Sequence, residues 1–459
     1  MNRAKENRGP KTPSVTDMTQ GNPLRLILLF AIPLFIGNVF QQVYNMVDTM
    51  VVGNHLGDSA IAAIGATTSL YSLIMNIANG LNTGYGIVVT QRFGAKNKNE
   101  MQQAIAGMFV LNVVVTVVLT IVSLAFLRPL MAFMNTPASI FQQAYSYIVV
   151  ICGGMVVTVC YNMFAAVLRA VGNSTAPLVF LIIACLLNIV LDIAFVIGLE
   201  MGVQGAAIAT VVAQAVAAIL CGVYLIRNYH DLLPQKSHFR VPGALIQDLL
   251  TTGIANALML VVVDMGTVVF QRANNSLGEL YITAYTSARR IVSLSFQPVF
   301  SLSTADSTFV GQNWGAGKIR RIRESQKSVL LTGFIWSLFC ILTFYTLGSA
   351  LIRLTTGTSD PDILSNAVLC LRTHVTMMPV LVVVLCLRAT MQAMGHKVAP
   401  VLSSAIEMVM KFGYAKWLIP ALGFFGICIT EPTIWVFMAL CLVINYLRMR
   451  KILYADNPV

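Results

Sequence analysis

The chain has 459 residues, of which 57% are hydrophobic and only 10% are charged. Soluble domains carry about 25% charged residues, so this composition excludes an ordinary soluble globular protein. The formal net charge is +12, but the Lys and Arg residues gather at the chain ends and in alternate short loops. That distribution is typical of the cytoplasmic loops of membrane proteins. We therefore assign the charge to membrane topology, expect no nucleic-acid partner, and place both termini in the cytoplasm.

Long hydrophobic runs predict twelve membrane helices, because about 20 apolar residues span a bilayer. The first six are expected at 24–52, 58–89, 98–127, 138–169, 176–198 and 204–226. The second six are expected at 244–274, 279–309, 319–350, 361–393, 398–420 and 427–450. The polar start of the chain contains no apolar segment typical of a signal peptide, so we expect the first helix to be retained.

The helix map divides the chain into two lobes. We expect a cytoplasmic tail at 1–23, an N-lobe at 24–227, a cytoplasmic linker at 228–241, a C-lobe at 242–450 and a second cytoplasmic tail at 451–459. The linker is the longest polar break in the middle of the chain. Glycines on the second helix, Gly80, Gly84 and Gly86, predict a close helix–helix approach.

An internal duplication supports this division. Four motifs of the first half recur 221 to 223 residues later: Ile61–Ile64 as Ile282–Tyr285, Gln91–Lys96 as Gln312–Gly317, Arg169–Gly172 as Gln392–Gly395, and Gly202–Gly205 as Gly423–Gly426. Each repeat has an even number of helices, so both repeats start on the same side of the membrane and are parallel. Long repeats of this kind are typical of secondary transporters, which bind substrate between them.

Polar residues inside the N-lobe helices predict a cation site. A charged group at bilayer depth costs at least about 2.5 kcal/mol, so each one needs an explanation. Asp48 lies on the first helix, Asn188 and Asp192 share one face of the fifth, and Thr210 lies on the sixth. Carboxylate, amide and hydroxyl oxygens suit Na⁺ or a proton. The alternatives are a solvated Asp48 near the headgroups, an interhelical hydrogen bond from Asn188, and a packing role for Thr210.

The C-lobe carries a different set of charges. Its candidates for a cavity or substrate site are Asp264, Arg289, Arg290, Glu407, Lys411 and Glu431. Glu407 and Lys411 are one helical turn apart, which favours a structural ion pair. The duplication aligns Glu431 with Thr210 and places Gly413 opposite Asp192, so we expect the lobes to share a fold but not a site.

The sequence resembles the multidrug and toxic compound extrusion (MATE) family, of prokaryotic type, over nearly its whole length. The stretches that carry the resemblance are Val47–Gly53, Arg169–Asn173, Asn188–Asp192 and Gly205–Thr210, with Pro33 fifteen positions before Asp48. The resemblance implies an all-α, V-shaped bundle with a kink at Pro33. It also implies that Asp48, Asn188 and Asp192 form the N-lobe cation site, with Thr210 as a further ligand.

These features together favour a secondary antiporter in the inner membrane of a prokaryote. It would export amphiphilic, cationic drugs or metabolites in exchange for Na⁺ or protons, with no other cofactor, as a monomer among membrane lipids. The alternative is a flippase or exporter of a lipid-linked or anionic amphiphile, which the basic C-lobe residues favour. An enzyme is not expected, because no catalytic motif accompanies the five histidines. The nine scattered cysteines are typical of buried packing residues.

Overall fold

The computed structural model describes residues 16–134, 136–357 and 360–449, and within these ranges the regular structure is helical, with no strand. The first half contains α1 Pro23–Leu56, α2 Asp58–Gly94, α3 Lys98–Phe133, α4 Ala138–Gly153, α5 Met155–Ala170, α6 Thr175–Asp192, η1 Ile193–Gly198 and α7 Gly202–Asn228. Two short 3₁₀ turns follow, η2 His230–Leu232 and η3 Lys236–Phe239. The second half contains α8 Gly243–Asn275, α9 Glu279–Gly315, α10 Ile319–Thr356, α11 Pro361–Thr376, α12 Met378–Ala393, α13 Val398–Gly413, η4 Tyr414–Leu418, α14 Ile419–Leu422 and α15 Phe424–Arg448.

The duplication is visible in the helix boundaries. Helix α9 begins and ends 221 residues after α2, and α11 and α12 begin and end 223 residues after α4 and α5. The bends also repeat, since α4 and α5 meet at 45° and α11 and α12 at 46°. A π-helical turn follows Asp192 at the end of α6, and another follows Gly413 at the end of α13. The repeats therefore share their irregular geometry as well as their helices.

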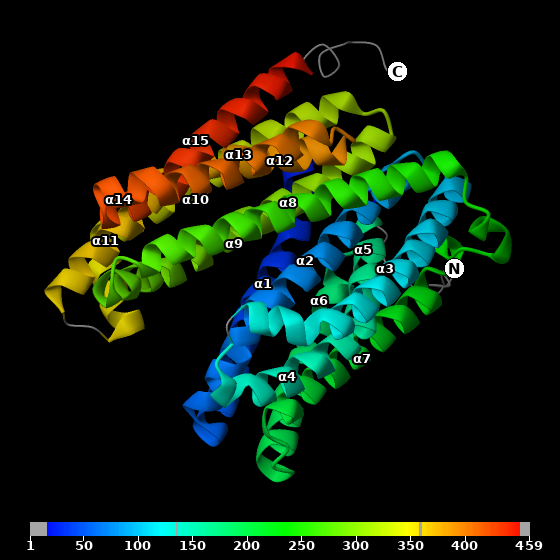
Figure 1. The fold of residues 1–459 in the computed structure, drawn as a ribbon. Helices are drawn as coiled ribbons and strands as arrows, with labels where there is room; N and C mark the ends of the chain where they lie inside the picture. The colour runs from blue at the N-terminus through cyan, green and yellow to red at the C-terminus, as the bar shows by residue number, and fades with distance from the viewer. Residues whose placement is uncertain (1–15, 135, 358–359, 450–459) are drawn as a thin grey trace, which may run out of the picture.

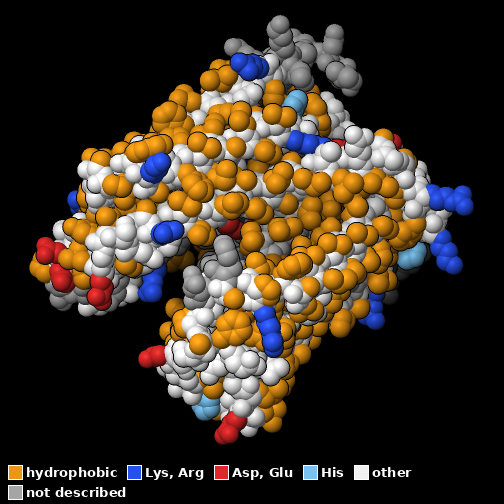
Figure 2. All heavy atoms as spheres, viewed as in Figure 1, with side chains coloured by type: hydrophobic (Ala, Val, Ile, Leu, Met, Phe, Trp, Pro, Cys, Tyr) orange, Lys and Arg blue, Asp and Glu red, His pale blue; other side chains and the backbone are white. Residues whose placement is uncertain are grey.

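Two groups of helices form the arms of a V (Figure 1). One arm holds the helices of the first half and the other those of the second, and the arms separate at one end of the molecule and join at the other. Hydrophobic side chains cover most of the visible surface, and a cleft separates the two arms (Figure 2). Exposed apolar residues such as Ile121 and Leu338 belong to this surface, which suits a lipid environment.

Seven helices are long and apolar enough to cross a membrane, and up to ten spans result if each strongly bent pair counts as one. The predicted helical segments all coincide with helices of the structure, although the sequence did not predict the breaks at Gly154 and Met377. Helix α1 is continuous through Pro33. The structure thus confirms an all-α membrane protein of the expected architecture.

Close backbone packing joins the arms where α2 crosses α8. A Cβ atom on Gly80 would lie 2.5 Å from the Cα of Ala257, and one on Gly84 would lie 2.5 Å from the carbonyl oxygen of Thr252. Real Cβ atoms do not approach so closely, so both positions need glycine. The predicted role of these glycines in helix approach is confirmed, and it agrees with the use of small residues at membrane helix crossings.

The joined end of the V, which we call the closed end, is built from the first duplicated motif pair. A Cβ atom on Gly94 would lie 1.9 Å from the carbonyl oxygen of Gln312, and one on Gly315 would lie 1.9 Å from that of Gln91. The ends of α2 and α9 therefore meet glycine to carbonyl in both directions. The conserved spacing of the motif within the chain reflects this contact.

The segment before α1 also lies at the closed end and contacts both arms. Gln312 Oε1 accepts a hydrogen bond from the backbone N–H of Met18 at 2.9 Å, and Asn313 donates to the carbonyl of Met18 at 3.1 Å. On the other arm, Gly172 packs against the carbonyl of Thr16 so closely that a Cβ would lie 2.3 Å from it. The segment therefore stabilises the junction of the two arms.

Candidate functional site: a carboxylate pair beside an amide-lined cavity

A pair of carboxyl groups lies inside the N-lobe. Asp48 on α1 and Asp192 at the end of α6 approach within hydrogen-bonding reach of each other. Asp192 is fully buried, and one oxygen of each carboxyl group, Oδ1, has no partner among the described residues. Two carboxylates in contact repel each other unless they share a proton or a cation. The geometry therefore provides a site for one positive charge.

The other two predicted ligands belong to the same cluster. With its amide nitrogen facing Asp192, Asn188 donates to Oδ2 of that residue at 2.8 Å and accepts from the backbone N–H of Thr210 at 3.0 Å. Asn188 is also buried, and the Thr210 hydroxyl donates to the carbonyl of Ala206 on its own helix. The structure thus brings together all four N-lobe residues that the sequence singled out.

Local backbone geometry places Asp192 where α6 changes its winding. The π-turn Ile193–Gly198 begins directly after it. Such turns shift the following residues around the helix axis and occur frequently at functional sites. Because the second repeat has the same turn after Gly413, the turn belongs to the fold, whereas the carboxylate belongs to the N-lobe alone.

Three tyrosines surround the carboxylate pair, and the sequence analysis missed them. Tyr44 hydrogen-bonds Thr210, and both Tyr44 and Tyr147 lie close enough to interact electrostatically with the two aspartates. Tyr71 completes the group through its proximity to Tyr44. Tyr44 is one helical turn before Asp48, and that spacing was the available signal.

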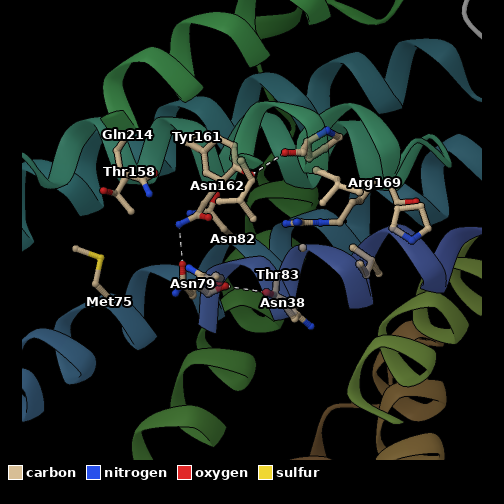
Figure 3. Close-up of a pocket in the computed structure, with 18 of the residues that line it drawn as sticks. Asn38, Met75, Asn79, Asn82, Thr83, Thr158, Tyr161, Asn162, Arg169 and Gln214 are labelled. Carbon is tan, nitrogen blue, oxygen red and sulfur yellow. Dashed lines mark hydrogen bonds between the residues drawn. The ribbon is translucent and has the colours of Figure 1, made fainter. Parts of the chain in front are cut away.

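A cavity of about 300 Å³ extends through the N-lobe between α1, α2, α5, α6 and α7. Its lining combines amide side chains with apolar ones, and Pro33 contributes to its wall. Asn162 donates to Asn79 at 2.7 Å across the cavity, and Asn38 donates to Ser301 of α9 at 3.3 Å (Figure 3). The cavity has the size and mixed lining of a small-molecule site.

Charged C-lobe residues are mostly paired with one another. Arg289 forms a salt bridge with Glu431, whose carboxylate also lies 3.6 Å from Nε2 of the buried His374. Lys411 binds Glu407 at 2.9 Å, so the ion pair predicted from their spacing is present. These pairs explain how the lobe holds so many charges, since each charge has a compensating partner.

The two remaining C-lobe candidates differ from these. Asp264 on α8 accepts a hydrogen bond of 2.6 Å from Asn76 on α2, so it links the two arms. Arg290 is exposed. The six C-lobe candidates therefore do not form one site, and in the described part of the chain no group of three or more His, Cys, Asp or Glu residues could hold a metal ion.

Two helical arms around a central path, with a buried carboxylate pair and an adjacent cavity, define a secondary transporter. A family model described as MatE matches residues 33–194 and again 255–415, once in each repeat. The chain belongs to this MATE family of membrane transporters, and it is not an enzyme.

Individual relatives agree with the family assignment. The chain is 28% identical to the "Probable multidrug resistance protein YpnP" of Bacillus subtilis over 353 residues, covering 75% of this chain and 77% of the relative. It is 26% identical to the "Probable multidrug resistance protein NorM" of Thermotoga maritima, covering 74% and 73%. A crystal structure of MATE in the bent conformation superposes with a TM-score of 0.88 at 22% identity, covering 97% and 98%. The last likeness concerns the fold.

Proposed function

We propose that the protein is a cation-coupled exporter of amphiphilic molecules. The observation that carries this proposal is the contact between Asp48 and Asp192, since a buried carboxylate pair with unpartnered oxygens binds one positive charge. Na⁺ or a proton serves as the coupling ion. The names of the relatives, which describe multidrug resistance proteins, support drugs and similar amphiphiles as the cargo.

Alternating access follows from the V shape. With both termini in the cytoplasm of a prokaryotic inner membrane, the closed end faces the cytoplasm and the open arms face outward. The cargo leaves from this conformation, and a cation enters the pair at Asp48 and Asp192. Cation binding and cargo binding then weaken each other, as thermodynamic linkage between two sites requires.

Export of a lipid-linked anion finds less support in the C-lobe. That hypothesis needs free positive charge in the path, but Arg289 and Lys411 each bind a glutamate. The C-lobe charges are therefore better explained as compensated pairs inside the arm.

The test of the proposal is transport in proteoliposomes with Na⁺ and pH gradients imposed separately. Ethidium serves as the cargo, and the variants are Asp48→Asn and Asp192→Asn. We expect wild-type protein to accumulate ethidium against its gradient under one of the two ion gradients and both variants to lose this accumulation. The matched control is Asp231→Asn in the linker, whose exposed carboxylate binds only Lys98, and it should transport normally. Accumulation by the Asp192→Asn variant at the wild-type level would reject the assignment.

A further inference from the structure

An arginine without an acidic partner lies at the inner end of the N-lobe cavity. Arg169 is on the last turn of α5 and lines both the N-lobe cavity and a second cavity of about 230 Å³. Residues of both arms, including Ser303 and Gln392, line the second cavity. Figure 3 shows the Arg169 side chain extending into the N-lobe cavity beside Asn82. The guanidinium group therefore stands between the N-lobe cavity and the path between the arms.

The absence of a partner distinguishes this arginine from other buried cations. Arg169 is largely buried, yet it makes no ion pair and no hydrogen bond within the described ranges. Arg289, by contrast, binds Glu431, and Lys411 binds Glu407. Burying a charge without a partner is costly, so such a group indicates a partner that the protein itself does not supply.

The chemistry of the surrounding cavity suits an anion with an apolar body. No aspartate or glutamate lines the cavity, so no competing negative charge faces the arginine. Asn82 Oδ1 and Gln214 Oε1 are buried acceptors without partners, which suits a ligand that also carries an N–H or O–H donor. Met75, Leu178 and Leu181 provide an apolar wall.

The duplication shows that the fold itself does not require this charge. Gln392 occupies the corresponding position of the second repeat, in the motif Gln392–Gly395 that matches Arg169–Gly172. Its amide donates to Asn256 at 2.6 Å, so it is satisfied within the protein. The same helix end therefore forms with a neutral side chain, and the arginine is specific to the cavity of the N-lobe.

From these observations we infer that Arg169 binds the carboxylate of an acidic or zwitterionic amphiphile in the N-lobe cavity. A planar guanidinium group binds a carboxylate through two parallel hydrogen bonds, which an ester cannot reproduce with the same strength. This inference deepens the proposed export function, because it names the class of cargo. The protein then exports molecules with an acidic group as well as cationic ones.

Equilibrium binding to purified full-length protein in detergent, without any ion gradient, tests the inference. The probes are dansylglycine and its methyl ester, which differ in the carboxylate, and binding is followed by dansyl fluorescence. The variants are Arg169→Gln, which introduces the residue of the second repeat, and Arg169→Lys. The control is Arg388→Gln, because Arg388 is also a buried arginine but donates to Ser403 and does not line this cavity.

We expect wild-type protein to bind dansylglycine about tenfold or more tightly than its ester, as loss of a charged hydrogen bond implies. Arg169→Gln should abolish the difference, Arg169→Lys should reduce it, and Arg388→Gln should retain it. Equal binding of both probes by wild-type protein, binding of neither, or an acid preference that survives in Arg169→Gln would overturn the inference. The wild-type comparison stands even if the variants do not fold. Since no gradient is involved, the result is independent of the test of cation coupling.

Discussion

Gln91 and Gln312, which are equivalent in the two repeats, bind the opposite arms in equivalent ways. The side-chain amide of Gln91 donates to the carbonyl of Ala393 at 2.8 Å, and that of Gln312 donates to the carbonyl of Ala170 at 2.9 Å. Each glutamine therefore reaches from the end of its own helix, α2 or α9, to the end of a helix in the other repeat. The duplicated motif forms a two-way connection across the closed end.

Removing both glutamines should favour opening of the closed end. Each hydrogen bond contributes about 0.5–1.5 kcal/mol, so the double variant Gln91→Ala/Gln312→Ala should change the ratio of conformations several-fold or more. Electron–electron distance measurements between spin labels at Met134 and Leu354, both exposed near the open ends of α3 and α10, should then show a larger population of short distances. The exposed Gln142 is the control position, since Gln142→Ala should leave the distribution unchanged. An unchanged distribution in the double variant would show that these bonds do not hold the closed end.

Alanine at the contact glycines should disturb the same junction. The Cβ of Gly315→Ala would lie 1.9 Å from the carbonyl oxygen of Gln91, so the two arms must move apart. We expect a melting temperature several degrees lower in a tryptophan-fluorescence or light-scattering melt. Gly65→Ala is a matched control on α2, because no atom lies within 4 Å of the added Cβ, and alanine is the better helix former. A loss of stability as large in Gly65→Ala would contradict this explanation.

The buried ion pair of the C-lobe should show strong coupling. Arg289→Met alone leaves Glu431 buried without its principal partner, and such changes cost about 3–5 kcal/mol. The double variant Arg289→Met/Glu431→Gln removes both charges and should recover much of the lost stability. A double-mutant cycle measured by melting in detergent quantifies the coupling. The exposed pair Arg320–Glu324 provides the comparison, since a cycle there should give less than about 1 kcal/mol. Additive effects at Arg289 and Glu431 would contradict the proposed pairing.

Cation binding should stabilise the N-lobe carboxylate pair. The repulsion between Asp48 and Asp192 is relieved when one positive charge binds, and an ion that binds only the folded protein raises its stability. The melting temperature of wild-type protein should therefore rise with added Na⁺ at constant ionic strength, or with falling pH if the ion is a proton. In Asp192→Asn the repulsion is absent, so the response should disappear while the melting temperature in the absence of the ion is maintained or raised. A full response in the variant would place the cation site elsewhere.

Much of the fold follows from the sequence because its signals are local. Helix positions come from long apolar runs, and the arrangement of the repeats comes from motifs with fixed spacing. The breaks at Gly154 and Met377 were not predicted, because the bends depend on packing between helices. The π-turns after Asp192 and Gly413 are likewise invisible in a pattern of apolar residues, since hydrophobic periodicity reports helix faces but not hydrogen-bond offsets.

The site was predicted in part. Asp48, Asn188 and Asp192 stood out because charged or amide groups are rare in apolar helices, and the structure brings them together. Tyr44 and Tyr147 did not stand out, because tyrosine is common in membrane helices and only the tertiary structure shows what its hydroxyl faces. Arg169 was interpreted as part of a loop motif, and its lack of an acidic partner becomes apparent only when its neighbours are known.

The central claim, that a cation at Asp48 and Asp192 drives release of the cargo, is tested most directly by competition at equilibrium. Ethidium fluorescence measures cargo binding to purified protein while Na⁺ concentration and pH are varied one at a time. We predict that the apparent Kd of ethidium rises with one of these two ions in wild-type protein and is independent of both in Asp192→Asn. An ethidium affinity that is insensitive to both ions in wild-type protein, or equally sensitive in the variant, would contradict the account.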